Sequence, residues 1–185
     1  MFDWFRARRA PAGPPFVDRV WVSLAARDRA LVRAALEGPV TVIAFFGATR
    51  DRAQAALAAA GSGVQVTLAD RPGRRLEGAI VVVEHHPLPG VNLALLERLA
   101  SEAPGVVPVF YSALDEPLML RFGGQNVAQM MARMGLVDDE PIEHPMVGKA
   151  LTSAREKVAA RLGAVAAAAT SARSMEEWLE LYLPA

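Results

Sequence analysis

The sequence predicts an α/β fold: a mainly parallel sheet flanked by helices, with a C-terminal helical extension. Two observations carry this prediction. From residue 16 to residue 114, short apolar runs alternate with helical patterns, as in domains built on a parallel sheet. After residue 114 only helical patterns follow. A chain of 185 residues with 52% hydrophobic residues has ample material for a core.

The strand predictions rest on apolar runs of strand length. PVTVIAFFG is continuous and rich in β-branched and aromatic residues, and GAIVVVEHH and VVPVFYSAL have the same character. FVDRVWVS alternates enough to be a short strand, and VQVTLAD is expected to be another. The predicted strand segments are 16–23, 39–46, 64–70, 78–86 and 106–114.

The helix predictions rest on apolar spacing and on end signals. Gly38 and Gly61 are placed to end two helices, and Thr49 is expected to cap the second of them. Ser174 and Glu177 form a capping box before the last helix. The predicted helical segments are 24–38, 48–61, 92–105, 115–124, 125–135, 145–170 and 174–183. One apolar stripe on the longest of them is formed by Val147, Leu151, Ala154, Val158, Leu162 and Val165.

Three parts of the chain are predicted. They are an N-terminal arm and linker (1–16), an α/β domain (17–137) and a helical extension (138–185). The arm places Phe2, Trp4 and Phe5 beside arginines, which would allow at most weak peripheral contact with a membrane surface. We favour docking of these aromatic rings on the domain, because so short a segment buries too little to hold a membrane.

Composition excludes several classes of function. The formal net charge is +0, with 20 basic and 20 acidic residues, so nucleic acid is not expected as a partner. The chain has no Cys, which removes disulfides, thiolate metal sites and Cys nucleophiles. No apolar run approaches the roughly 20 residues needed to cross a bilayer. We expect a cytoplasmic protein.

No set of catalytic or cofactor-binding residues is visible. Gly148 and Lys149 resemble the end of a phosphate-binding loop, but Ala150 stands where a magnesium-binding hydroxyl is needed. His85 and His86 follow each other on a predicted strand and should point to opposite faces, so a shared metal site is not expected. We interpret them as a polar strand end. No cofactor is predicted, and the chain is not expected to be an enzyme.

Two stretches carry a resemblance to a known family. FYSALDEPLMLRFG and MMARMGLVDDEPIEHPMVGKALTSAREKVAARL resemble SecA, the preprotein translocase motor, at the end of its second nucleotide-binding domain and the start of its helical scaffold. Weaker, collinear similarity extends the resemblance over 18–162. It implies a RecA-like fold of the helicase second-domain type.

The departures from the family imply lost activity. The family's first motor domain carries the P-loop and the acidic magnesium site, and this chain has neither. The arginines that the second domain contributes should fall near Leu95, Glu97 and Ala100, where only Arg98 is found. ADRPGRRLEG is too short for the Gly-rich nucleotide-sensing motif. The preprotein-binding insert and zinc-binding tail are also missing. The resemblance therefore suggests a degenerate copy of that domain.

The first functional hypothesis is a non-catalytic interaction or accessory module with a link to protein export. Its partner is unidentified, with translocase components and a second copy of the chain as candidates. The alternative is that the same residues have only a structural role at the helix junction. Asp115 and Glu116 would then stabilise a helix N-terminus. Arg121 would pair with an acid in the 138–144 turn, and Phe122 would fill the core. The candidate residues are Asp115, Glu116, Arg121, Phe122, Glu140, Glu143 and His144.

The second hypothesis is a nucleotide-responsive half-site acting in trans with another ATPase domain. Loop arginines near the carboxyl edge of the sheet would supply the positive charge. The simpler interpretation is that these arginines are solvated. They are Arg50, Arg52, Arg71, Arg74, Arg75 and Arg98.

Overall fold

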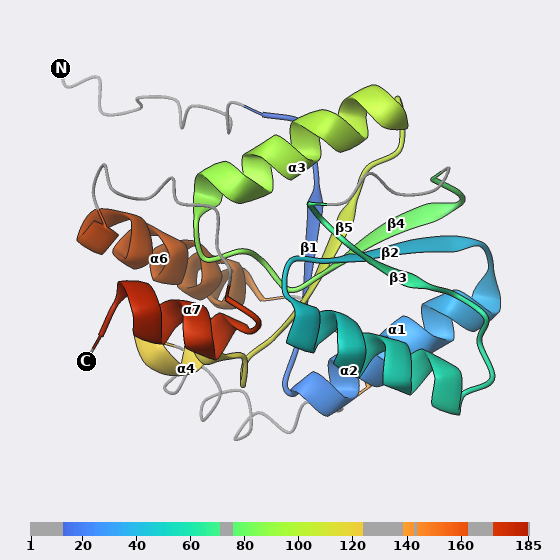
Figure 1. Cartoon of the computed structure of the whole chain (residues 1–185), viewed down its shortest axis with the longest axis horizontal. Coiled ribbons are helices and arrows are strands. Elements are labelled where there is room, and N and C mark those ends of the chain that lie inside the picture. The colour runs from blue at the N-terminus through green and yellow to red at the C-terminus, as the bar shows by residue number, and fades with distance from the viewer. Residues whose placement is uncertain (1–12, 71–75, 124–138, 143, 163–171, 185) are drawn as a thin grey trace, which may run out of the picture.

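The computed structural model describes residues 13–70, 76–123, 139–142, 144–162 and 172–184. Strands and helices alternate up to residue 113, except that β3 is followed by β4 among the described elements, and helices follow (Figure 1). The described elements are β1 (Val17–Trp21), α1 (Leu24–Glu37), β2 (Val40–Ala44), α2 (Gly47–Ala59), β3 (Val66–Leu68), β4 (Ala79–Val83), α3 (Pro89–Glu102), β5 (Val109–Ala113), α4 (Pro117–Phe122), α6 (Pro145–Leu162) and α7 (Met175–Tyr182).

The sheet has the strand order β1-β5-β4-β2-β3, and every pairing is parallel. This confirms the predicted α/β fold, and the arrangement is consistent with a RecA-like domain. The central strands β4 and β5 are almost wholly buried, which explains why their sequences are continuous apolar runs rather than alternating ones.

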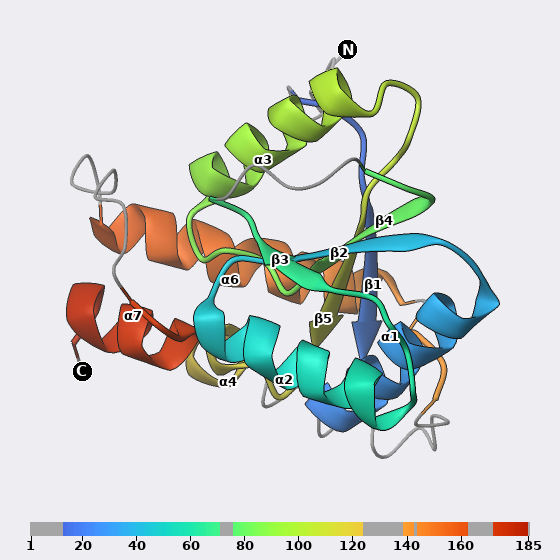
Figure 2. The same cartoon turned by 45° about the vertical axis from the view of Figure 1, so that its right-hand side comes forward.

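Helices cover both faces of the sheet (Figure 2). α1 and α2 pack on one face, where Leu31 and Leu57 join inward residues of the strands. α3 packs on the opposite face through Leu95, Leu96 and Leu99. The two faces therefore carry separate apolar clusters, as expected for an open parallel sheet.

A third apolar cluster lies beyond the carboxyl ends of the strands. Phe46 and Leu114, which follow β2 and β5, pack there with residues of α4, α6 and α7. The predicted stripe on α6 is confirmed over Val147–Val158, whose inward residues are buried. Residue 165 and the predicted helix 125–135 lie outside the described residues. The C-terminal helices thus share a core with the end of the sheet, while the proposed boundary at 138 stays a prediction.

The structure corrects one of the predicted helix caps and confirms another. The prediction that Thr49 caps α2 is wrong, because the helix begins at Gly47 and Phe46 occupies the cap position without a side-chain bond. The Thr49 hydroxyl instead donates to Glu84 Oε1. The cap of α7 is confirmed, since Ser174 Oγ accepts from the Glu177 amide. The Glu177 carboxylate reaches the amide of Arg173 rather than that of the cap residue.

We expect Gly78→Ala to destabilise the protein by about 2–3 kcal/mol. Gly78 has a φ of +66°, and an added Cβ would lie 1.8 Å from the carbonyl oxygen of Pro39. Gly61 is the matched control, because its φ is +75° but nothing lies within 4 Å of an added Cβ. Gly61→Ala should cost only about 1 kcal/mol, for the left-handed backbone alone. Urea unfolding of both variants measures the difference, and equal losses would contradict the close approach.

Candidate functional site at the carboxyl edge of the sheet

Open parallel sheets bind their ligands outside the carboxyl ends of the strands. In this chain that edge holds a buried group of charged side chains. Arg27 comes from α1, Glu84 follows β4, and Glu116 follows β5. All three are nearly inaccessible, with exposed fractions of 1–3%.

Arg27 is the centre of this buried group. Its Nη1 donates to Glu116 Oε1 at 2.9 Å, and its Nη2 donates to Asp28 Oδ1 at 3.0 Å. Glu116 Oε1 also accepts from the amide of Ala113 at 2.9 Å. Arg52 on α2 donates to the second carboxylate oxygen of Asp28 at 2.6 Å. The group therefore joins α1, α2 and the end of β5.

Glu84 completes the group from β4. It is the one non-glycine residue with positive φ, at 62°, among those the structure describes. Its amide donates to the Tyr111 carbonyl at 2.8 Å, and its carboxylate accepts from the Thr49 hydroxyl at 2.7 Å. Non-glycine residues in the left-handed region cost roughly 1–2 kcal/mol, so this local conformation must be held by the bonds around it.

Three carboxyl groups and two guanidinium groups meet at this edge. Burial raises the pKa of Glu84 to about 7 and that of Glu116 to about 8, against the opposing influence of Arg27. Burial is the largest cause in both cases, and repulsion from Glu84 raises the pKa of Glu116 further. Near neutral pH the group therefore retains a proton.

We expect the free energy of unfolding to fall as pH rises from 6.5 to 8. Glu116 has an ordinary pKa of 4.5 and a folded pKa of about 8, so in this window the folded state holds a proton that the unfolded state has released. Below pH 6.5 the neutral, buried His86, with its pKa lowered to about 4, acts in the opposite sense. The expected slope is about 1 kcal/mol per pH unit.

Urea unfolding at several pH values measures this slope. Glu116→Gln keeps an acceptor oxygen and removes the titration, so its profile should be flatter between pH 6.5 and 8. A wild-type profile that is level over this range, or a variant with the same slope, would contradict the retained proton.

The helix N-termini at this edge are already occupied by the chain itself. The amide of Leu24, first in α1, donates to Asp115 Oδ1 at 2.6 Å. The amide of Ala48 in α2 donates to the carbonyl of Arg173, just before α7, at 2.9 Å. Helix N-termini are common anion sites, and here internal acceptors take donors that an anion would use.

Helix α7 lies directly over this edge (Figure 1). Trp178 is 1% exposed and meets His86 edge to face, with ring centroids 5.5 Å apart. Arg121 of α4 donates to the carbonyls of Leu179 and Leu183 at the end of α7. We call the segment 172–184 the C-terminal cover, because it packs against residues at this edge.

The candidate residues in and next to α4 are mainly structural. Asp115 stabilises the N-terminus of α1 rather than of its own helix, and Glu116 makes no cap bond to α4. Arg121 donates to carbonyls at the end of α7, and no pair with Asp139 or Glu140, the described acids of the turn, accompanies these bonds. Phe122 is 5% exposed and lies in the third apolar cluster, as expected.

The turn that precedes α6 is anchored at two points. Asp139 accepts from Arg29 Nε at 2.7 Å, and the amide of Ile142 donates to the Val20 carbonyl at 2.7 Å. Glu140 is exposed. His144 Nδ1 accepts from the Met146 amide at 3.2 Å. Glu143 lies outside the described residues.

The two adjacent histidines are buried, which the interpretation as a polar strand end missed. His85 is 1% exposed and stacks on Phe110, with centroids 4.0 Å apart. His86 is 4% exposed and stacks on Phe46. Their pKa values are lowered by burial. Among the described residues no group of three or more His, Asp or Glu side chains is arranged to hold a metal ion.

The described loop arginines do not converge on the edge as free charges. Arg50 pairs with its neighbour Asp51 at 2.6 Å, and Arg52 pairs with Asp28. Arg98 donates to the Ala69 carbonyl at 2.7 Å. Residues 71, 74 and 75 lie outside the described part of the chain.

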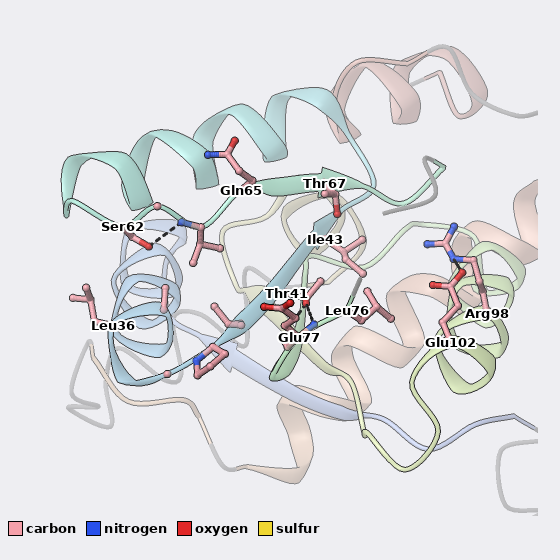
Figure 3. A pocket seen from close by; sticks show the side chains of 16 residues that line it. Leu36, Thr41, Ile43, Ser62, Gln65, Thr67, Leu76, Glu77, Arg98 and Glu102 are labelled. Atoms are coloured by element: carbon pink, nitrogen blue, oxygen red, sulfur yellow. Dashed lines mark hydrogen bonds and ion pairs between the residues drawn. The ribbon is translucent and has the colours of Figure 1, made fainter. Parts of the chain in front are cut away.

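A broad groove of about 790 Å³ lies elsewhere, beside β2 and β3. Figure 3 shows Ile43, Thr67 and Leu76 on its floor and walls. Arg98 and Glu102 of α3 face each other there at 3.7 Å. Because these two charged side chains pair with each other inside the groove, we take the buried group at the carboxyl edge as the candidate site.

The fold and this site define a class of protein: an α/β domain consistent with the RecA-like type, with its ligand edge closed. The chain is 38% identical over 82 residues to the protein translocase subunit SecA of Sorangium cellulosum, which is 44% of this chain and 8% of that protein. It is 36% identical over 104 residues to SecA of Syntrophomonas wolfei, and this match covers 55% of this chain and 12% of that protein. It is 35% identical over 89 residues to SecA of Symbiobacterium thermophilum, and this match covers 47% of this chain and 10% of that protein.

This chain is therefore SecA-like over about half of its length, and the homology is partial. The matched segments span 8–12% of the length of these relatives. No family model matches the chain. Within the described residues, no helix is both long enough and apolar enough to cross a membrane.

Proposed function

We propose that the chain is a non-catalytic, SecA-like accessory module that contacts a component of the protein translocase. One observation carries the proposal: the edge where a domain of this fold would hold its ligand is filled by the chain's own groups. The Ala48 amide donates to a carbonyl of the C-terminal cover, and the Leu24 amide donates to Asp115. Arg27 donates to two carboxyl groups.

The similarity to SecA supports the link to translocation. The SecA-like stretch that begins at Phe110 folds into the junction of α4 and α6, which pack on each other. Two large apolar side chains of this junction are exposed, Leu120 at 46% and Met146 at 46%. In a protein that resembles only about a tenth of a larger one, exposed apolar side chains in the shared segment are the best candidates for contact with a partner.

Binding between the purified chain and a full-length SecA tests the proposal directly. We expect saturable binding by biolayer interferometry, and we expect Leu120→Asp together with Met146→Asp to weaken it about tenfold or more. Both side chains are on the surface, so the fold should be retained. Leu36→Asp is the matched control, because Leu36 is 64% exposed but lies on α1, away from this junction.

Two outcomes would overturn the proposal. One is the absence of binding to SecA and to the other purified translocase components. The other is equal loss of binding in the junction variant and in Leu36→Asp, which would show that the contact is non-specific.

A further inference from the structure

A second cavity lies on the opposite side of the sheet from α1 and α2. It is bounded by the segment 13–16, by α3 and by α6, and its volume is about 350 Å³. The wall is mainly apolar and includes Phe16, Leu93, Leu96 and Phe110. This volume falls at the lower end of the range for small-molecule sites, which is roughly 300–1,000 Å³.

At the polar side of the cavity, hydrogen bonds link the side chains of Asp18, His85 and Arg155. Asp18 Oδ1 lies 2.5 Å from His85 Nε2, and His85 Nδ1 lies 2.9 Å from Arg155 Nη1. Because a guanidinium can only donate, His85 Nδ1 must accept and its proton must be on Nε2, which donates to Asp18. His85 is therefore a neutral link, and both of its ring nitrogens are used.

Arg155 lines the cavity and is only partly satisfied. Its one hydrogen bond is to His85, and no carboxylate among the described residues lies within ion-pair distance of it. Burial lowers the pKa of Arg155, with the charges of Asp18 and Glu156 acting in the opposite direction from a distance. Arg155 is half-buried, and its remaining N–H donors have no acceptor among the described residues, so they can bind a carboxylate or a phosphate.

We propose that this cavity binds a small apolar carboxylate. The carboxylate would accept from the unpaired N–H groups of Arg155, and the apolar body would lie against Phe16, Leu93 and Leu96. A carboxylate fits because the polar end of the cavity offers a planar donor group. An apolar body fits because most of the remaining lining is aromatic or aliphatic, with Asn92, Thr152 and Glu156 as its other polar members. The inference does not rest on the proposed translocase contact, which uses other surfaces.

Calorimetric titration with octanoate tests the site, and octanol serves as the neutral probe of similar shape. We expect a saturable one-site curve with octanoate and binding of octanol that is about tenfold weaker or more, since charge-assisted hydrogen bonds are the stronger kind. In Arg155→Met the preference for octanoate should be lost. Lys149→Met is the control, because it removes an exposed positive charge from the same helix without touching the cavity.

A second variant keeps the test decisive if Arg155→Met does not fold. Thr152 lies at the exposed rim of the cavity, and Thr152→Trp should block entry while leaving Arg155 in place. We expect it to abolish octanoate binding without lowering thermal stability. The proposal is overturned if octanoate does not bind at millimolar concentration, or if binding is unchanged in Arg155→Met or in Thr152→Trp.

Discussion

Glu116→Ala is expected to lower the free energy of unfolding by about 3–5 kcal/mol. The substitution removes the shared acceptor of two buried donors, the guanidinium of Arg27 and the amide of Ala113. Each unsatisfied buried donor costs about 1–3 kcal/mol, and Arg27 cannot shed its charge to escape the loss. It also leaves a void beside the N-terminus of α4.

Two comparison variants separate this effect from the loss of any ion pair. Glu116→Gln retains the acceptor oxygen and should cost less than about 1.5 kcal/mol. Asp139→Ala removes a pair of similar geometry, the 2.7 Å contact with Arg29, whose side chains are about half exposed. That loss should stay below about 1 kcal/mol. If Glu116→Ala cost no more than Asp139→Ala, the buried group would not be what holds the carboxyl edge together.

Trp178→Ala is expected to cost about 3–5 kcal/mol and to release the C-terminal cover. Trp178 is buried in the third apolar cluster and contacts both His86 and Tyr182. Without it, α7 retains few other buried side chains, chiefly Met175 and Leu179. Release of the cover would also remove the Arg173 carbonyl from the Ala48 amide.

Hydrogen exchange together with urea unfolding measures both parts of this expectation. The Ala48 amide should be protected in the wild type and exchange faster in Trp178→Ala, while amides in β4 remain protected. Leu181→Ala is the matched control, because Leu181 lies on the same helix but is 58% exposed. It should change stability by no more than about 0.5 kcal/mol. Unchanged protection of Ala48 in Trp178→Ala would show that the cover is not what occupies this amide.

The sheet could be predicted from the sequence because its strands obey local rules. Segments 39–46, 78–86 and 106–114 each contain a nearly continuous apolar run, which is the pattern expected of a parallel strand that is buried on both faces. The ends of α1 and α2 were also marked locally, by Gly38 and by Gly61, whose φ is positive. Hydrogen bonds between side chains that are far apart in the sequence had no such local signal.

The buried group at the carboxyl edge shows why the rest was missed. Arg27 lies in the stretch LAARDRALVR, where its charge marks it as a surface residue, and its partner Glu116 is 89 residues away. Nothing in helical spacing predicts that an arginine turns inward. One signal was present: Glu84 and Glu116 both follow apolar strands closely, and parallel strands bring such positions to the same edge.

Thr49 and Arg121 illustrate the same limit. Both were assigned to local roles, a helix cap and a pair with the nearby turn, because local partners are all that spacing can suggest. In the fold Thr49 serves Glu84 and Arg121 serves the end of α7. Each interaction depends on where a distant segment packs, so tertiary structure decided it.

The central proposal is that the chain's own groups occupy its ligand edge and that the chain does not bind nucleotide there. Calorimetric titration of the full chain with ATP and with ADP, each with magnesium, tests this most directly, with a full-length SecA as the positive control. The structure predicts no saturable heat up to millimolar nucleotide, because the amides of Leu24 and Ala48 and the guanidinium of Arg27 are already bound. A saturable one-site curve would contradict the claim and favour a nucleotide-responsive half-site.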